Sequence, residues 1–247
     1  MLQWDDNIVA IVFGAPIKSN ERCRALYIQL IFPQYTVPIM LCHENEAQFR
    51  QCVEKNWSPI GPANDQNKNY AEGYLFAYSM QPFHVIKFFL SGSCMTVSSM
   101  DTTVILQYYQ QLYAYVPIAQ KATLTLATNA VRLSNQTYGS IFHFKIPRPT
   151  PPRFIYYSVA YVFEAKFPYS IVKVATKPLD LPEAHKDRPC GFKYTTGLTF
   201  VQGRLAVMYT CDNQTVSMYL DEIEGIFKDM VDVNDLSNLM IKRNKDF

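Results

Sequence analysis

Short hydrophobic runs, separated by polar and turn-forming residues, recur along the whole chain. Val, Ile, Tyr, Phe and Thr dominate these runs, and many alternate with polar residues, as half-buried β-strands do. The pattern predicts strands in NIVAIVFG, RALYIQLIF, YTVPIML, GYLFAYS, FHVIKFFL, TVILQYYQQLYAYV, ATLTLAT, SIFHFKI, FIYYSVAYVFEA, SIVKVAT, GLTFVQ, RLAVMYT and TVSMYL. We therefore expect an all-β sandwich, barrel or propeller.

Helix-compatible patterns occur at only two places. ENEAQFRQCVEKNW (44–57) has apolar positions near helical spacing, and YLDEIEGIFKDMVDVNDLSNLMIK (219–242) predicts helical turns that close the C-terminus. Gln202-Gly203 lies between two strand-like runs and predicts a hairpin turn. The proline-rich IPRPTPPR (146–153) is expected to form a rigid loop, which can line a pocket. We expect one domain over residues 1–247.

Composition and charge narrow the class of protein. Hydrophobic residues make up 49% and charged residues 18% of 247 residues, which excludes a disordered chain. No run approaches the ~20 apolar residues of a membrane span, and a net charge of +2 with interleaved signs gives no reason to expect nucleic acid. MLQWDDN does not resemble an export signal, so we expect a cytoplasmic protein, a component of a particle or assembly, or export by another route.

The six cysteines are widely scattered, without the spacing of a zinc site. We expect them to be buried free thiols and expect no metal or cofactor. Neither an Asp-x-Asp motif nor a glycine-rich phosphate loop occurs.

EKNWSPI (54–60) is the stretch whose side chains suggest sugar chemistry. Lys55 and Asn56 offer hydrogen-bonding groups for sugar hydroxyls, and Trp57 offers an aromatic face for sugar C–H groups. The alternative is that Trp57 belongs to the core and its neighbours are solvated. Arg132, and Arg148 and Arg153 of the proline-rich loop, are candidates for binding a phosphate or a sugar acid, although surface arginines need no ligand.

Several stretches, in order, resemble the five-bladed β-propeller superfamily of mannoside phosphorylases, hydrolases and similar mannosyltransferases. EKNWSPI followed by GYLFAYSMQPFHVIKF resembles the family's E-K-N-W-x-P-F motif and the hairpin after it. RLSNQTYGSIFHFKI, YSVAYVFEAKFPYSIVKVATKPL and CGFKYTTGLTFVQGRLAVMYTCDNQTVSMYLDEI resemble later blades. The resemblance extends from Glu54 to Ile223 and implies a propeller whose strand ends converge on one axial pocket.

The resemblance also assigns candidate substrate-binding residues. It implies that His143 lies where phosphorylases hold phosphate or the leaving sugar, and that Asp212 faces the sugar. Within strands, both His84 and His143 also suit a structural role, and an Asp at the turn of Asp212 is common for local reasons. These alternatives stay open at this point.

The sequence departs from the family at its acidic motif. WDDNIVAIVFG carries Asp5 and Asp6 where the family has an E-D-P-R-like motif, so Asp6 or Asp5 is the candidate catalytic acid. The strand pattern supports about three to four blades and a short C-terminal helix. An incomplete ring leaves strand edges that self-association or a hetero-oligomer would cover.

Three functional classes follow from these observations. The first is a carbohydrate-active enzyme, a mannoside-type glycosyltransferase, phosphorylase or glycosidase, whose partner is a sugar or glycan. The second is a non-catalytic propeller that binds glycan or serves as a structural subunit of a larger assembly such as a virus particle. The third is an unrelated β-sandwich interaction module, because strand content alone does not distinguish all-β folds.

Overall fold

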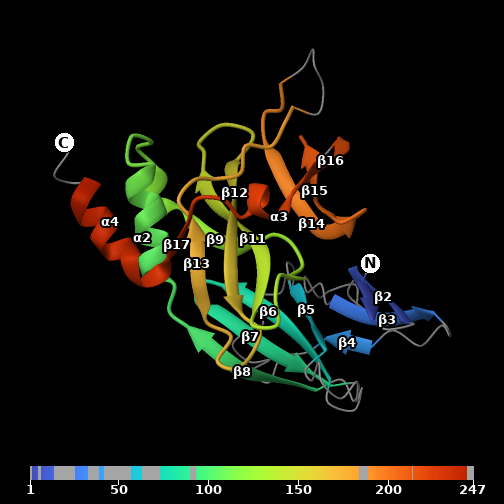
Figure 1. The fold of residues 1–247 in the computed structure, drawn as a ribbon. Helices are drawn as coiled ribbons and strands as arrows, with labels where there is room; N and C mark the ends of the chain where they lie inside the picture. The colour runs from blue at the N-terminus through green and yellow to red at the C-terminus, as the bar shows by residue number, and fades with distance from the viewer. Residues whose placement is uncertain are drawn as a thin grey trace, which may run out of the picture. The chain divides into compact units, whose positions relative to one another are not determined.

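The computed structural model consists mainly of β-sheets, with a few short helices among the described residues (Figure 1). It describes the backbone of residues 2–4, 7–13, 26–32, 39–41 and 57–62, and then 73–89, 93–183, 189–212 and 214–243. Side chains are described from Trp57 onward within these ranges, apart from that of Pro62. The chain divides into two compact units. The first comprises Met1–Tyr78 and His84–Ser98, and the second comprises Ser79–Phe83 and Ser99–Phe247.

Two four-stranded sheets, each with its strands in sequence order, account for most of the first unit. One sheet contains β1 (Leu2–Trp4), β2 (Asn7–Phe13), β3 (Leu26–Phe32) and β4 (Ile39–Leu41). The other contains β5 (Ser58–Pro62), β6 (Tyr74–Met80), β7 (Phe83–Phe88) and β8 (Cys94–Met100). Gly73 precedes β6 at a φ of +85°, and a Cβ there would lie 2.2 Å from the carbonyl oxygen of Phe88, so glycine suits both the backbone and the space.

Two further sheets and three helices form the second unit. The six-stranded sheet has the order β10-β11-β12-β13-β17, with β9 also paired to β11, and the three-stranded sheet has the order β14-β15-β16. The strands of the six-stranded sheet are β9 (Thr123–Leu126), β10 (Val131–Arg132), β11 (Thr137–Pro147), β12 (Phe154–Glu164), β13 (Ile171–Ala175) and β17 (Met230–Asp232). The other three strands are β14 (Lys193–Val201), β15 (Arg204–Cys211) and β16 (Thr215–Asp221).

Helices cover one face of the six-stranded sheet. Helix α2 (Thr103–Leu112) lies beside α4 (Leu236–Arg243), and Gln111 Nε2 donates to the carbonyl of Met240 at 3.2 Å (Figure 1). Helix α3 (Ile223–Ile226) and two short 3-10 turns, Ala119–Lys121 and Val233–Asp235, complete the helical segments of the described residues.

Side-chain alternation along β11 gives the sheet two different faces. Phe142 and Phe144 are fully buried and contact the ring of Tyr109 in α2. Ile141 points to the opposite face and joins a hydrophobic cluster with Leu198 and Val207 of the three-stranded sheet. His143 is on the same face as Ile141, so the alternation places it between the two sheets.

The first ten residues of TVILQYYQQLYAYV form helix α2 and the last four form turns, so our prediction of a strand there is wrong. Ile105, Tyr108 and Tyr109 are its buried residues, and their spacing of three and four positions places them on one helical face. The aromatic and β-branched content suggested a strand, but the segment buries one helical stripe against the sheet. Aromatic content is therefore a weaker guide here than the spacing of the buried positions.

The expectation of a mainly β chain with a short C-terminal helix is confirmed. The turn at Gln202-Gly203 joins β14 to β15, and both residues have positive φ angles, 52° and 79°, as a tight hairpin requires. The predicted helix over 44–57 lies outside the described residues apart from Trp57. The single domain, the number of blades and the completeness of the ring stay predictions.

Candidate functional site

A pocket of about 420 Å³ opens in the second unit, at the end of the β11–β12 hairpin. Pro147 pairs with Phe154, so the proline-rich residues 148–153 form the loop that joins the two strands. We call this the aromatic pocket, and its lining residues are Pro152, Arg153, Phe154, Tyr156, Phe192 and Tyr194. The prediction that the proline-rich loop can line a pocket is confirmed for Pro152 and Arg153.

Four of the lining residues are aromatic, and they come from two chain segments. Phe154 and Tyr156 lie two positions apart in β12, while Phe192 directly precedes β14 and Tyr194 lies within it. The ring centroid of Tyr156 lies 5.0 Å from that of Tyr194 and 6.0 Å from that of Phe192. Burial raises the pKa of both tyrosines above the usual value. Both phenols are therefore neutral hydrogen-bonding groups at physiological pH.

Positive charge lies beside these rings. Arg153 is an exposed member of the lining, and Lys145 of β11 places Nζ 3.8 Å from the ring centroid of Phe154, within cation–π distance. Arg148 is absent from the pocket lining, although its backbone N–H donates to the carbonyl of Arg153 at 2.8 Å. The two arginines of the loop therefore occupy different positions relative to the pocket.

His143 is completely buried behind the pocket. Its ring centroid lies 4.2 Å from that of Tyr194 and 5.3 Å from that of Tyr156. Nε2 accepts the backbone N–H of Thr195 at 3.2 Å and lies 2.8 Å from its Oγ1. Burial, reinforced by the charge of Lys145, lowers the pKa of His143 to about 3, so the ring is neutral at physiological pH and its proton is on Nδ1.

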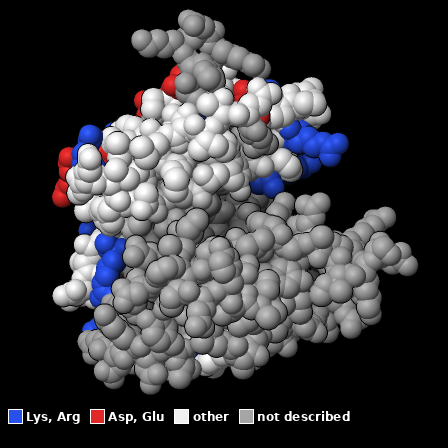
Figure 2. Space-filling model, turned by 90° about the vertical axis from the view of Figure 1, so that its right-hand side faces the viewer, with Lys and Arg blue, Asp and Glu red and all other residues white. Residues whose placement is uncertain are grey.

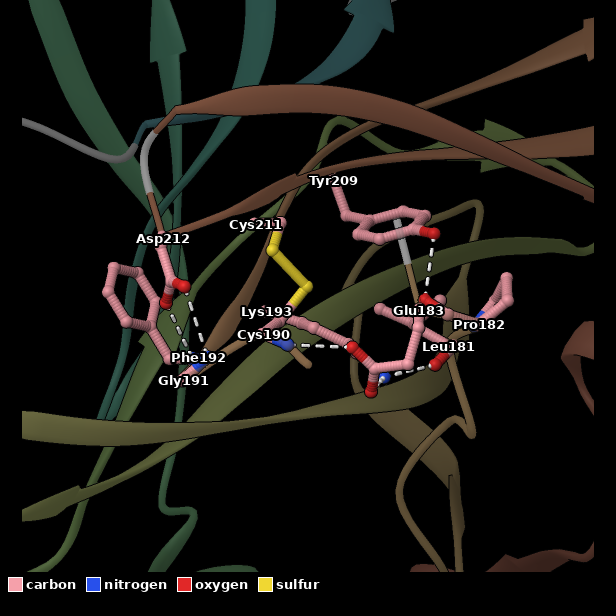
Figure 3. A network of polar contacts seen from close by, with 10 residues as sticks. All are labelled: Leu181, Pro182, Glu183, Cys190, Gly191, Phe192, Lys193, Tyr209, Cys211 and Asp212. Atoms are coloured by element: carbon pink, nitrogen blue, oxygen red, sulfur yellow. Dashed lines mark hydrogen bonds and ion pairs between the residues drawn. A yellow bond between two sulfur atoms is a disulfide. The ribbon is translucent and has the colours of Figure 1, made fainter. Parts of the chain in front are cut away.

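Asp212 holds the chain segment that carries Phe192 (Figure 3). Its carboxylate accepts the backbone N–H groups of Gly191 at 3.1 Å and Phe192 at 3.0 Å, and its own N–H donates to the carbonyl of Phe192 at 3.1 Å. Asp212 has a φ of +53°, a conformation that Asp tolerates better than most residues. Asp212 therefore has structural hydrogen bonds to the segment 191–192, and its contact with a sugar stays a prediction.

Cys190 and Cys211 form a disulfide, so the expectation that all six cysteines are free thiols is wrong for this pair. Lys193 pairs with Cys211 across the β14–β15 hairpin, which brings Cys190, three residues earlier, back toward the same point. The two Cα atoms are 5.4 Å apart, a distance that suits a disulfide. Cys94 is a buried free thiol, as expected.

The other predicted site residues are not part of the pocket lining or are outside the described residues. Trp57, only 6% exposed, packs on Phe76 and Tyr78 in the first unit, and half-buried His84 lies in β7 of the same unit. Arg132 binds the carbonyl of Ser134 at 3.1 Å and is not part of the pocket lining. The predicted positions outside the described residues are Asp5, Asp6, Lys55 and Asn56. Their roles stay predictions.

Arg153, His143 and Asp212 are therefore the predicted residues that the structure brings into or near this site. Asp212 accepts the backbone N–H of Phe192, and His143 accepts that of Thr195. Both therefore bind the segment 192–195, in which Phe192 and Tyr194 line the pocket. We did not predict from the sequence that the four aromatic lining residues form one group. Their signal was present as two aromatic-x-aromatic pairs, Phe154–Tyr156 and Phe192–Tyr194, one of which directly follows the proline-rich loop.

The remaining surface features set few limits on function. On the face shown in Figure 2, the Lys and Arg side chains of the described residues form separate small groups, with Asp and Glu between some of them. Within the described part of the chain, no helix has the length and apolarity to cross a membrane. No cluster of three His, Cys, Asp or Glu side chains suited to a metal ion occurs among those residues either.

Comparisons with known proteins give similarity at the level of the fold. No protein-family model matches the chain, and no curated protein matches it. Among solved structures, a candidate glycosidase from Bacteroides thetaiotaomicron aligns with a TM-score of 0.57 and 12% identity over 91% of this chain and 65% of its own. A glycosyl hydrolase from Bacteroides ovatus aligns with a TM-score of 0.54 and 11% identity over 91% of this chain and 64% of its own.

A third structure is directly relevant to the sequence resemblance. It is from the GH130 family of mannoside phosphorylases, which contains glycoside hydrolases that target β-1,2-mannosidic linkages in Candida mannan. It aligns with a TM-score of 0.51 and 11% identity over 89% of this chain and 63% of its own. The chain spans about two thirds of the length of these structures. At these identities the likeness establishes a shared fold with glycoside hydrolases and GH130 mannoside phosphorylases.

Proposed function

We propose that the chain recognises a mannose-containing carbohydrate in the aromatic pocket. The observation that supports this most strongly is the set of four aromatic rings from two chain segments, together with Arg153, around one open pocket. Aromatic faces pack against the C–H patches of a sugar ring, and a guanidinium donates hydrogen bonds to hydroxyl or anionic oxygens. The volume of about 420 Å³ is within the range of small-ligand pockets.

Two independent similarities support a mannoside as the ligand. The sequence motifs resemble the mannoside phosphorylase and hydrolase superfamily from Glu54 to Ile223. The fold likeness includes a GH130 structure. One fold hosts many functions, so the fold alone does not identify the sugar. We choose β-1,2-mannobiose as the first probe because of the similarity to the GH130 structure.

The experiment is a calorimetric titration of the protein with β-1,2-mannobiose, in which two arginine variants are compared. Arg153→Ala removes a lining guanidinium, whereas Arg148→Ala removes an arginine of the same loop from outside the lining. We expect Arg153→Ala to weaken binding about tenfold, the loss expected for a hydrogen bond to a charged group, and Arg148→Ala to bind like the wild type. Absent binding, or equal weakening in both variants, would contradict the assignment.

Cleavage or phosphorolysis of a mannoside is the second candidate function. The fold likeness to glycoside hydrolases supports it, and Asp6 or Asp5 is the proposed acid. We expect wild-type protein to release mannose, or mannose 1-phosphate when phosphate is present, from β-1,2-mannobiose. The Asp6→Asn and Asp5→Asn variants should identify the acid by losing turnover while retaining binding.

Binding without turnover in the wild-type protein would instead favour the non-catalytic class. That class includes a glycan-binding or structural subunit of a larger assembly. Its proposed homo- or hetero-oligomeric contacts would cover open strand edges. A solution mass equal to that of one 28.5 kDa chain would contradict such an assembly for the isolated protein.

A further inference from the structure

Residues 190–192 are tied to residues 211–212 by one covalent bond and three hydrogen bonds, which we call the 190–212 link. The covalent bond is the Cys190–Cys211 disulfide. Two of the hydrogen bonds run from the N–H groups of Gly191 and Phe192 to the Asp212 carboxylate, and the third runs from the N–H of Asp212 to the carbonyl of Phe192. Because all four bonds fall within three residues, they fix the backbone just before β14.

The space around this link is close-fitting. A Cβ at Gly191 would lie 3.0 Å from Oδ1 of Asp212, closer than ordinary van der Waals contact. A side chain at position 191 would therefore disturb the carboxylate that accepts the two N–H groups. The glycine allows Asp212 to approach the backbone closely enough to bind both donors.

A second group of contacts anchors the same segment from the other side. Glu183 Oε2 accepts the backbone N–H of Cys190 at 2.7 Å, and Glu183 Oε1 lies 2.6 Å from Nζ of Lys193 (Figure 3). Nζ of Lys193 also donates to the carbonyl of Leu181 at 2.6 Å. The hydrogen bond from Lys193, and then that from the N–H of Cys190, lower the pKa of Glu183 below its usual value.

Phe192 is the pocket residue that this link positions. Its ring lines the aromatic pocket and contacts Tyr156 at a centroid distance of 6.0 Å. The ring of Phe192 is only partly buried, so neighbouring side chains enclose it less completely than they enclose a core residue. The fixed backbone therefore contributes to the position of the ring. An aromatic face that is already in place saves the ordering cost of immobilising it on binding.

We propose that Asp212 and the Cys190–Cys211 disulfide act as positioning residues for Phe192, so that the affinity of the aromatic pocket for its sugar depends on the redox state of this disulfide. The dependence on a sugar rests on the proposed function, whereas the positioning of Phe192 does not. Reduction by a dithiol transfers two electrons and two protons to the disulfide. The S–S bond breaks, Cys190 and Cys211 become thiols, and the dithiol becomes a disulfide.

The first measurement is backbone hydrogen exchange over residues 189–195 in the full chain. Oxidised wild-type protein is compared with protein reduced by dithiothreitol and with Asp212→Asn, which replaces one of the two accepting oxygens by a donor. We expect the Gly191 and Phe192 amides to exchange about tenfold faster after either change. Unchanged exchange in both cases would overturn the proposal, whatever the sugar result.

Asp229→Asn is the matched control for Asp212→Asn. Asp229 is exposed, has the same φ of 53°, and is not part of the pocket lining. Its variant therefore tests whether an Asp-to-Asn change at a left-handed turn is enough to alter exchange at 191–192. Faster exchange in Asp229→Asn equal to that in Asp212→Asn would overturn the specific role of Asp212.

The second measurement is the affinity for β-1,2-mannobiose in the same samples. We expect binding about fivefold weaker in reduced protein and in Asp212→Asn, the cost of ordering one aromatic side chain on binding. The Cys190→Ser/Cys211→Ser protein should bind like reduced wild type and should not respond to dithiothreitol, which separates this disulfide from other thiols. Equal affinity in oxidised and reduced protein would overturn the redox dependence.

The two measurements separate the two proposals. If oxidised wild-type protein does not bind β-1,2-mannobiose but exchange at 191–192 rises on reduction, the proposed function fails and the positioning role is supported. If binding occurs and neither exchange nor affinity responds to reduction or to Asp212→Asn, the proposed function is supported and the positioning role fails.

Discussion

Nε2 of His143 lies 2.8 Å from Oγ1 of Thr195, and both side chains are completely buried between β11 and β14. Nε2 also accepts the backbone N–H of Thr195. This pair joins the six-stranded sheet to the three-stranded sheet directly behind Tyr156 and Tyr194. The site therefore depends on a neutral histidine.

Acid should destabilise the fold through His143. Its pKa falls from 6.5 to about 3 on folding because burial disfavours the charged ring. Below pH 6.5 the unfolded state binds a proton that the folded state does not, so the free energy of unfolding falls as pH falls from 6.5 toward about 3. We expect a loss on the order of 2 to 3 kcal/mol at pH 4.5, measured by urea unfolding at several pH values.

Histidine variants assign this pH dependence. His143→Gln should unfold more easily at pH 7 but show a smaller loss between pH 6.5 and 4.5. His84→Gln, at a half-buried position in β7, should retain the wild-type slope. A wild-type slope in His143→Gln would show that other groups cause the acid sensitivity.

Removing the disulfide should lower the free energy of unfolding, because the unfolded chain then gains conformational entropy. Cys190 and Cys211 are separated by 21 positions, and closing a loop of this length is worth about 3 kcal/mol in the chain-entropy model. We expect Cys190→Ser/Cys211→Ser to lose about this amount in urea unfolding. Loss of the same size in Cys94→Ser, a buried free cysteine, would indicate a general sensitivity to cysteine replacement instead.

A methyl group at Gly139 should disturb the packing of the C-terminal segment. The added Cβ would lie 2.3 Å from Cζ of Phe227 and 2.8 Å from Cδ1 of Leu133, so one of these side chains must move. We expect Gly139→Ala to cost about 1 to 3 kcal/mol. Gly203→Asn is the control for a substitution without a steric clash: no atom lies within 4 Å of a Cβ there, and asparagine is among the residues that adopt its left-handed backbone most readily. Equal losses in the two variants would contradict the steric explanation.

Tyr109 should contribute to stability through its hydroxyl as well as its ring. The buried hydroxyl donates to the carbonyl of Ala175 in β13, which ties α2 to the six-stranded sheet. We expect Tyr109→Phe to lower the free energy of unfolding by about 1 kcal/mol. Tyr115→Phe should have no measurable effect, since Tyr115 is 77% exposed. An unchanged free energy of unfolding in Tyr109→Phe would show that this hydrogen bond does not stabilise the protein in solution.

Strands and the hairpin at Gln202-Gly203 were predictable because their signals are local. SIFHFKI is buried on both faces of its sheet, so its signal is a nearly continuous run of strand-forming residues, and Gly203 suits the positive φ of its turn. The helical structure of residues 103–112 was not predictable from their composition. Ile105, Tyr108 and Tyr109 have helical spacing, but aromatic residues also favour strands.

The site was predictable only in part, because it forms through contacts between segments distant in sequence. Arg153 was found through its rigid loop, and His143 and Asp212 through resemblance. Phe192 lines the pocket while Asp212, twenty positions later in the chain, accepts a hydrogen bond from its backbone N–H. The Cys190–Cys211 pairing likewise depends on the register of β14 and β15, which the cysteine spacing alone does not reveal.

A crystal structure of the chain soaked with saturating β-1,2-mannobiose would show whether the aromatic pocket binds the sugar. We expect a sugar ring between the aromatic residues of the pocket, with an oxygen within hydrogen-bonding distance of the Arg153 guanidinium. A sugar bound elsewhere on the chain, with the aromatic pocket empty, would contradict this expectation.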